Sequence, residues 1–252
     1  MRVLLALFLA LAALPLRAEE VVLGLSRTEV PITATFDGSD ILIFGAIKRE
    51  EPIPDGPPLE IVITISGPST PVIVRRKDKQ LGIWVNTDQV EVDAAPSFYA
   101  VLTSAPLPQS ISYTEDLRHS VTIPNAIRSV GAPQGIDDSY AFTEALIRLR
   151  TRTGLYKHVD GGVVIDEQTL FRGQVTLPAN LTEGDYETRI FLTRGGRVVG
   201  LYTTTIAVNK VGLERSLYDM AQEQPFLYGL MSLVIAIAAG WGASAAFAAM
   251  RR

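Results

Sequence analysis

The chain has 252 residues, with 23 lysines and arginines against 27 aspartates and glutamates, and it has no cysteine. The net charge of -4 and the pI near 5.3 argue against a nucleic-acid-binding protein, which normally carries a basic face or stripe. The absence of cysteine excludes thiol nucleophiles, redox pairs and thiolate metal sites. This length allows one large or two small domains once the apolar ends of the chain are set aside.

Residues 1–18 have the pattern of a secretory signal peptide. A basic start at Arg2 precedes an apolar run from Val3 to Leu14, and Pro15 and Ala18 follow it. The run of about 12 residues is too short to cross about 30 Å of hydrocarbon as a helix. We expect cleavage after Ala18, and an uncleaved membrane anchor is the alternative.

The region from Glu20 to about Pro108 is predicted to consist of strands. Residues 41–44, 59–65 and 72–74 are rich in β-branched side chains and are separated by turn motifs of Gly, Pro, Asp and Ser. Residues 75–80 lie between two apolar segments, the second of which starts at Leu81. The pattern therefore predicts a hairpin with its tip at residues 75–80.

A helix is predicted in the middle of the chain. Residues 137–139 provide helix-capping side chains, Gly154 is placed to end the helix, and one apolar face contains Phe142, Ala145, Leu146 and Leu149. Strands return at 163–165, 170–177, 186–193 and 197–208, with a two-residue hairpin turn at Gly195–Gly196. The fold class predicted is mainly β: one or two immunoglobulin-like antiparallel sandwiches with an inserted helix.

The C-terminal segment is predicted to cross a membrane. Residues 226–250 carry no charge, and as a helix they would be about 37 Å long. Phe226 and Tyr228 suit one membrane interface, and Arg251 and Arg252 place the C-terminus in the cytoplasm. The alternative is a buried soluble helix. Before this span, residues 211–221 form either a short amphipathic helix or a plain spacer.

These segments give a domain division. We expect a signal peptide (1–18), a β-sandwich region (19–128), a helix followed by a second β region (129–209), a juxtamembrane segment (210–225), the transmembrane helix (226–250) and a cytoplasmic tail (251–252). Within the transmembrane helix a small residue recurs every fourth position, which would let another helix approach closely, although the high content of Gly, Ala and Ser also explains the pattern. The ladder consists of Ser232, Ala236, Gly240, Ser244 and Ala248.

The sequence contains no convincing catalytic, cofactor or metal motif. His119 and His158 have no second ligand at a useful spacing, and His158 begins what we interpret as a turn through Gly162. Two basic clusters are candidate contacts for an anionic ligand, anionic lipid headgroups or an acidic partner, with solvated surface charge as the alternative. They consist of Arg75, Arg76, Lys77 and Lys79 in the predicted hairpin, and of Arg148 and Arg152 on the predicted helix.

The layout resembles the alphaproteobacterial putative transmembrane protein family. The motifs that carry this resemblance span nearly the whole chain: they include residues 44–47, 83–86, 154–156, 178–181, 184–186 and 210–215. They are structural motifs, so the resemblance implies a location and assigns no functional residue. Some members of this family are encoded beside a sulfite-exporter-type permease, and the resemblance therefore implies an accessory role.

Three functions follow from these expectations. The leading hypothesis is a non-enzymatic accessory or binding module for another envelope protein, held in the bacterial inner membrane by one span with most of the chain in the periplasm. The alternatives are an envelope hydrolase that uses two carboxylates brought together by the fold, and a chaperone-like sandwich that donates a strand. We expect no cofactor and no nucleic acid as partner, and self-association is compatible with the small-residue ladder.

Overall fold

The computed structural model describes residues 20–33, 35–48, 56–130, 138–211 and 213–250, and these fall into two compact units. The first unit, called the body here, runs to Val30 and continues from Asp37 to Val208. The second contains Pro31–Phe36 and the chain from Asn209 onward. The predicted signal peptide and cytoplasmic tail lie outside the described residues.

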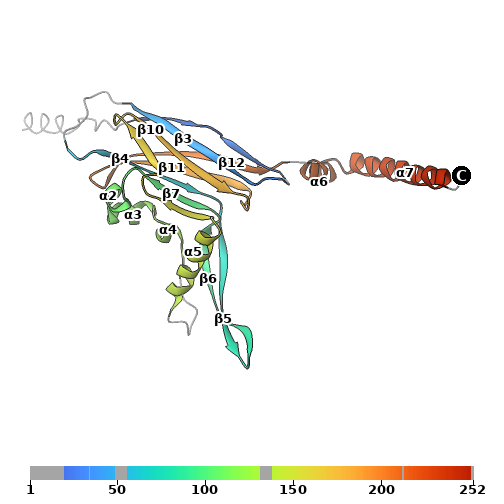
Figure 1. The fold of residues 1–252 in the computed structure, drawn as a ribbon, viewed down its shortest axis with the longest axis horizontal. Coiled ribbons are helices and arrows are strands. Elements are labelled where there is room, and N and C mark those ends of the chain that lie inside the picture. Colours follow the sequence, from blue (N-terminus) through green and yellow to red (C-terminus); the bar gives the residue numbers. More distant parts are fainter. Residues whose placement is uncertain (1–19, 34, 49–55, 131–137, 212, 251–252) are drawn as a thin grey trace, which may run out of the picture. The chain divides into compact units, whose positions relative to one another are not determined.

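The body is built on two main sheets and one separate hairpin (Figure 1). The four-stranded sheet has the order β1 (Glu20–Leu25), β3 (Gly38–Lys48), β10 (Leu170–Pro178) and β9 (Val163–Asp166). The six-stranded sheet has the order β2 (Glu29–Ile32), β12 (Arg197–Lys210), β11 (Gly184–Arg194), β4 (Leu59–Ser66), β7 (Tyr99–Thr103) and β8 (Tyr156–Val159). The hairpin pairs β5 (Ser69–Gln80) with β6 (Ile83–Pro96). The mainly β fold predicted from the sequence is confirmed.

The two main sheets face each other across an aliphatic core. Ile41 and Ile43 of β3, Ile63 of β4 and Ile190 of β11 have no exposed surface. A β-carbon built on Gly173 of β10 would lie 3.3 Å from the Ile63 side chain, so the two inner faces are in contact there. Buried and outward residues alternate along β10, whereas β4 is buried from Ile61 to Ile65 because both of its faces are covered.

Short helices cover the other face of the six-stranded sheet. They are α2 (Leu107–Ser110), α3 (Tyr113–His119) and α4 (Ile123–Ala126), together with the longer α5 (Ser139–Arg152). Leu146 of α5, and Val121 between α3 and α4, form one apolar cluster with Val62, Val101 and Phe191 of the sheet. The sequence predicted α5 and missed the other three. Because the chain makes this helical crossover after β7, β8 returns parallel to β7, a departure from the antiparallel order expected.

Helix α5 follows the prediction at its centre and departs from it at its ends. Phe142 and Leu146 are buried and Gly154, with φ +74°, follows the end of the helix. Leu149, which was predicted on the apolar face, is 46% exposed. The last turn of the helix is held by Arg150, which donates hydrogen bonds to the Tyr156 hydroxyl (2.8 Å) and to the carbonyl of Pro96. Asp138 stands at the N-cap position, but its side chain caps no amide.

The two predicted hairpin turns have different outcomes. Gly195 and Gly196 lie between β11 and β12 with φ +56° and +76°, as a two-residue turn requires. In the β5–β6 hairpin the turn is Leu81–Gly82, with φ +50° and +90°, so the prediction of a tip at residues 75–80 is wrong. Those residues continue strand β5, and the chain reverses where Gly82 takes up a left-handed conformation.

The second unit contains two helices, α6 (Leu213–Glu223) and α7 (Pro225–Met250). The predicted apolar helix is confirmed. Pro225 occupies its first turn, where backbone N–H groups have no acceptor within the helix, so proline loses no hydrogen bond there. Residues Pro225–Ser244 have a mean hydropathy of 1.8 and are long enough to cross a membrane. Their side chains are not buried inside the protein, so the apolar surface is available to lipid.

Candidate functional site

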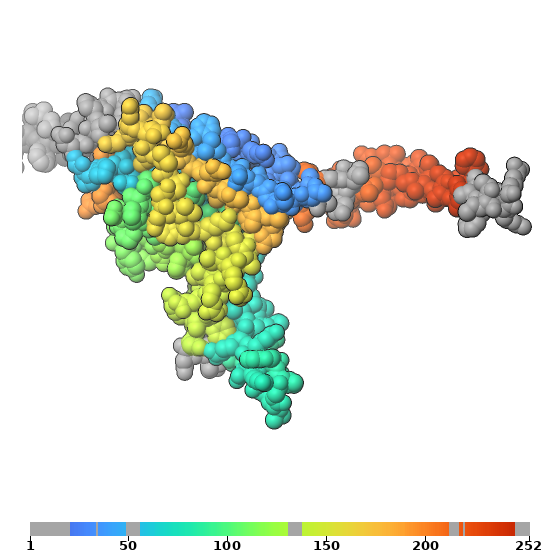
Figure 2. Space-filling view, in the orientation of Figure 1, coloured from blue at the N-terminus to red at the C-terminus, as the bar shows by residue number. Residues whose placement is uncertain are grey.

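The β5–β6 hairpin forms an arm that leaves the main sheets. Near its base, Val90 and Val92 are buried and Val72 and Val74 pack against the cluster that contains Leu146 of α5. Beyond Arg75 every residue of β5 is exposed, and no other element of the described body covers the tip. Figure 2 shows this part of the arm, in teal, extending past α5. The base therefore fixes the direction of an otherwise uncovered hairpin.

The four basic residues predicted in this hairpin lie on two different faces of it. Side chains alternate along a strand, so Arg75, Lys77 and Lys79 share one face, called the basic face here, and Arg76 points to the other. Arg76 donates hydrogen bonds to Asp88 (2.8 Å) and Asp138 (2.5 Å). Those two carboxylates raise the pKa of the Arg76 guanidinium.

Arg76 is a structural link between the arm and α5. Its guanidinium also lies 5.0 Å from the ring centre of Phe142 on that helix. This explains why Asp138 does not cap α5: its carboxylate is turned toward Arg76. Arg76 is therefore not available to an external anion.

The basic face has no such neutralisation. Arg75, Lys77 and Lys79 are exposed and make no ion pair among the described residues. Across the hairpin Trp84 is paired with Lys79, which places its exposed indole on the same face. This combination of unpaired cations and an exposed aromatic ring has no evident role in the stability of the body.

Arg148 and Arg152 do not join this cluster. Both are exposed on α5, one helical turn apart. Since α5 packs on the face of the hairpin that holds Arg76, the basic face points away from α5. The structure therefore separates the two predicted basic clusters into two surfaces.

A second exposed surface, which the sequence did not predict, is the outer face of the four-stranded sheet. An antiparallel sheet with one face on the core normally has a polar outer face. Here the strand registers place five large apolar side chains on that face, and we call this group the apolar face. It consists of Val22 (59% exposed), Leu42 (38%), Phe44 (44%), Val164 (44%) and Leu170 (55%).

Small residues lie between several of the large side chains of the apolar face. Val22 is paired with Ala46, and Ala46 is paired with Leu170 on the next strand. The ring of Phe44 lies over Gly24 of the neighbouring strand, where a β-carbon would come within 2.5 Å of the ring. Arg172 stands within this surface beside Phe44, and no ion pair is found for it in the described residues.

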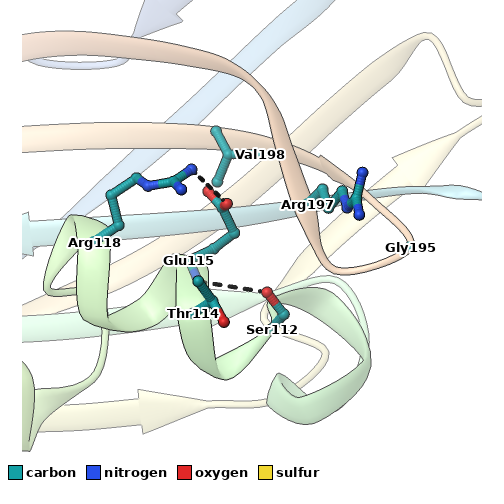
Figure 3. A pocket seen from close by; sticks show the side chains of 7 residues that line it. All are labelled: Ser112, Thr114, Glu115, Arg118, Gly195, Arg197 and Val198. Atoms are coloured by element: carbon teal, nitrogen blue, oxygen red, sulfur yellow. Dashed lines mark hydrogen bonds and ion pairs between the residues drawn. The ribbon is translucent and has the colours of Figure 1, made fainter.

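The body also contains a polar pocket of about 610 Å³ between α3 and the turn joining β11 to β12 (Figure 3). Glu115 is its one carboxylate, and it lies 2.7 Å from Arg118 and 3.4 Å from His119. Ser112, which lines the pocket too, accepts a hydrogen bond from the Glu115 amide as the cap of α3. The paired carboxylates that a hydrolase would need are not assembled by the residues lining this pocket.

The two histidines have local partners. His119 approaches Glu115, and His158 lies 3.1 Å from Asp160. The Asp160 carboxylate also accepts hydrogen bonds from Thr103 (3.1 Å) and from the amide of Leu107 (3.0 Å), which fixes the start of α2. Burial raises the pKa of Asp160, but these hydrogen bonds and His158 outweigh it, and the net pKa is lowered. Among the described residues no three His, Asp or Glu side chains gather as a metal site would require.

The predicted small-residue ladder lies on α7. Ser232, Ala236, Gly240 and Ser244 are exposed, and the side chain of Ala248 lies outside the part of the structure that is described. Positions four apart in a helix lie on one side of it, so the ladder forms a single stripe. Within the described residues this helix is not buried against other parts of the protein, and the pairing of the stripe stays a prediction.

A family profile matches nearly the whole chain. The profile of a family described as "Putative transmembrane protein" matches residues 20–249, which include both sheets, the arm and α7. The chain belongs to this family. The resemblance stated from the sequence is thereby confirmed, and membership agrees with the one candidate membrane span.

Other comparisons add little. No curated protein matches the chain. The solved structure of BslA, a bacterial hydrophobin, is 12% identical over 77% of this chain and 99% of that chain, with a TM-score of 0.22. That TM-score is too low for the likeness to bear on fold or function. The match covers the β-rich body and nearly all of the C-terminal apolar helix of this chain, and no activity comes with membership.

Proposed function

We propose that the chain is a non-enzymatic accessory protein that binds another protein of the same membrane through the apolar face of its body. The observation that carries this proposal is the group of five large apolar side chains exposed on the outside of an antiparallel sheet. Exposed apolar patches of this kind mark interaction sites, because leaving them in water is unfavourable. The anchor α7 confines the choice of partner to the surface of one membrane.

The orientation follows from the two ends of the chain. A signal peptide at residues 1–18 exports the body, and Arg251 and Arg252 keep the C-terminus in the cytoplasm. The partner then meets the body on the periplasmic side of the bacterial inner membrane. The family resemblance makes a sulfite-exporter-type permease the first partner to test.

Orientation is measurable because the chain contains no cysteine. A cysteine introduced at exposed Leu201 of the body is the only thiol in the protein. A membrane-impermeant maleimide applied to spheroplasts is expected to label this L201C variant without permeabilisation. Labelling that requires permeabilisation would place the body in the cytoplasm and overturn the proposed topology.

The binding surface is tested by site-specific photo-crosslinking in native membranes. A photoreactive amino acid at position 44 is compared with the same amino acid at position 201, because Phe44 and Leu201 are equally exposed at 44% and 43%. We expect an integral membrane protein to be captured from position 44 and not from position 201. The substitution Leu170→Ser should abolish that capture, since it removes an apolar side chain from the contact and adds a hydroxyl in its place.

Two further results separate the surfaces involved. Replacing residues 226–250 by a poly-leucine span is expected to leave the capture intact, which assigns the contact to the body. Loss of capture on this exchange would assign the partner to α7. Equal capture from positions 44 and 201 would mean that the apolar face is not the binding surface.

One observation favours strand addition as a second function. Strand β1 lies at the edge of its sheet, and Val21 to Leu25 within it are apolar or glycine. Such an edge can pair with a strand of another chain. Strand addition predicts that crosslinkers at consecutive positions from 21 to 25 reach client residues in a regular order, whereas docking on the apolar face predicts capture from position 22 and not from position 21.

A further inference from the structure

The tip of the arm displays apolar side chains that the body does not use. Leu81 is fully exposed at 104%, and Ile83 and Trp84 are exposed at 66% and 67%. A two-residue hairpin turn favours Asn, Asp or Gly, yet here a leucine takes a left-handed φ of +50°. A bulky residue in that conformation, held wholly in solvent, indicates a requirement other than folding.

Behind this tip the charges follow in a fixed order. Lys79, Lys77 and Arg75 succeed one another on the basic face, two residues apart, so that they span about 13 Å of strand. Trp84, opposite Lys79, lies level with the first of the cations. Along the arm the apolar tip is thus followed by a level that holds Trp84 and Lys79, and then by Lys77 and Arg75.

This order matches the cross-section of a bilayer leaflet. Acyl chains accept apolar side chains, the headgroup boundary favours tryptophan, and anionic phosphates attract lysine and arginine. An acidic protein surface would be complementary to the three cations but would leave Leu81 and Ile83 against polar groups. A bilayer is complementary to both the apolar tip and the cations, and the apolar helix α7 would hold the chain at such a bilayer.

We propose that the β5–β6 arm is a second membrane contact: Leu81, Ile83 and Trp84 enter the interface of a bilayer that contains anionic phospholipid, and Arg75, Lys77 and Lys79 bind its phosphates. This contact is independent of the protein-binding role proposed for the apolar face, because none of its residues belongs to that face. Its function is to fix the body against the membrane at a second point.

Tryptophan fluorescence tests the proposal on the full chain. The protein has two tryptophans, so in a Trp241→Phe background Trp84 is the only one. The chain is reconstituted in nanodiscs of phosphatidylcholine alone or with phosphatidylglycerol. With phosphatidylglycerol we expect blue-shifted emission from Trp84, quenching by brominated lipid and protection from aqueous acrylamide. In phosphatidylcholine alone these effects should be weaker.

Matched variants assign the effect to the arm. Lys77→Ala with Lys79→Ala should lower the ratio of inserted to free Trp84 by about fivefold per lysine. Arg148→Ala with Arg152→Ala removes the same charge from α5 and should leave the ratio unchanged. Leu81→Asn suits the φ of the turn and removes the apolar side chain, so it should reduce insertion without unfolding the hairpin.

Three results would overturn the proposal. The first is Trp84 emission that is solvent-like and equally open to acrylamide in both kinds of nanodisc. The second is an equal loss of insertion in the arm and α5 variants, which would reduce the effect to general charge attraction. The third is capture of an acidic protein from position 81 in native membranes while Trp84 stays in water. None of them affects the crosslinking test at position 44.

Discussion

At the scale of single residues, two glycines determine how the apolar face is built. A β-carbon on Gly24 would lie 2.5 Å from the ring of Phe44, which is partly exposed and can turn away. A β-carbon on Gly45 would lie 2.7 Å from the Phe171 ring, which is buried, and 2.8 Å from the carbonyl oxygen of Val22, which belongs to the backbone of β1. The first clash can relax and the second cannot.

We therefore expect Gly45→Ala to lower the free energy of unfolding by about 1–3 kcal/mol, the usual range for overpacking. Gly24→Ala should lower it by less than about 1 kcal/mol and should instead displace Phe44. Denaturant unfolding of the detergent-solubilised chain compares the two. A larger loss for Gly24→Ala would show that Phe44 is held more rigidly than its exposure indicates.

Buried tyrosines make the body sensitive to alkali. Burial raises the pKa of Tyr99 to about 12, and its hydroxyl donates to the carbonyl of Val121 (2.9 Å) while Arg189 donates to it (3.3 Å). An unfolded tyrosine has a pKa near 10. The folded protein thus holds this proton more tightly, so the stabilisation is complete below pH about 10 and is lost as pH rises through about 12.

The expected outcome is a fall in the free energy of unfolding of about 2–3 kcal/mol across that interval, from about two pKa units at 1.36 kcal/mol each. Tyr99→Phe should flatten the dependence in part. Tyr156 and Tyr186, whose pKa values are also raised by burial, should preserve the remainder. Phenolate absorbance and unfolding are followed together as pH is raised. Complete ionisation of all tyrosines while the chain is still folded would contradict this account.

At the scale of elements, Arg76 is expected to couple the arm to α5. It joins Asp88 on β6 to Asp138 at the start of the helix and lies over Phe142. Arg76→Ala should speed amide hydrogen exchange in the first turns of α5, while the last turn, held by Arg150, should be unchanged. Arg75→Ala is the control, since Arg75 points to the opposite face. Equal effects of the two substitutions would mean that charge on the arm, not this contact, orders the helix.

The longer elements were predictable because each repeats its pattern over many residues. Segments rich in β-branched residues and separated by turn motifs predicted most strands, and 25 uncharged residues predicted α7. Helices α2, α3 and α4 have four to seven residues, too short for an apolar period to show. One signal was present: Ser112 followed by Glu115 is a capping-box spacing, and Ser112 does cap α3.

The candidate surfaces were less predictable than the elements. Arg75, Arg76, Lys77 and Lys79 were grouped because they were placed in a turn, where side chains share no fixed face. Once they form a strand, the period of two separates Arg76 from the others. The apolar face needs more, because Val22, Phe44 and Leu170 come together only through the pairing of β1, β3 and β10. Local sequence does not determine that order of strands.

At the scale of the whole molecule, the chain has three surfaces with no partner in its described part. They are the apolar face, the arm and the stripe on α7. If a single helix held the body at a membrane, partner binding would carry an orientational cost. The membrane contact proposed for the arm would lower that cost, and it would raise the effective concentration of the apolar face at the membrane surface.

The stripe on α7 carries the last prediction, which is self-association. Small residues at every fourth position let two helices approach closely enough for extensive van der Waals contact in lipid. Gly240 lies in the middle of the ladder, and Gly242 lies two residues away, off the stripe. A leucine at position 240 would separate the two backbones, whereas one at position 242 would face lipid.

We therefore expect Gly240→Leu to weaken dimerisation of the full chain in bicelles by about tenfold and Gly242→Leu to leave it unchanged, as measured by energy transfer between labelled copies. Because both variants lose one glycine and gain the same side chain, equal weakening would mean that composition, not the stripe, brings the helices together. A monomeric parent chain would assign the stripe to a larger membrane protein instead.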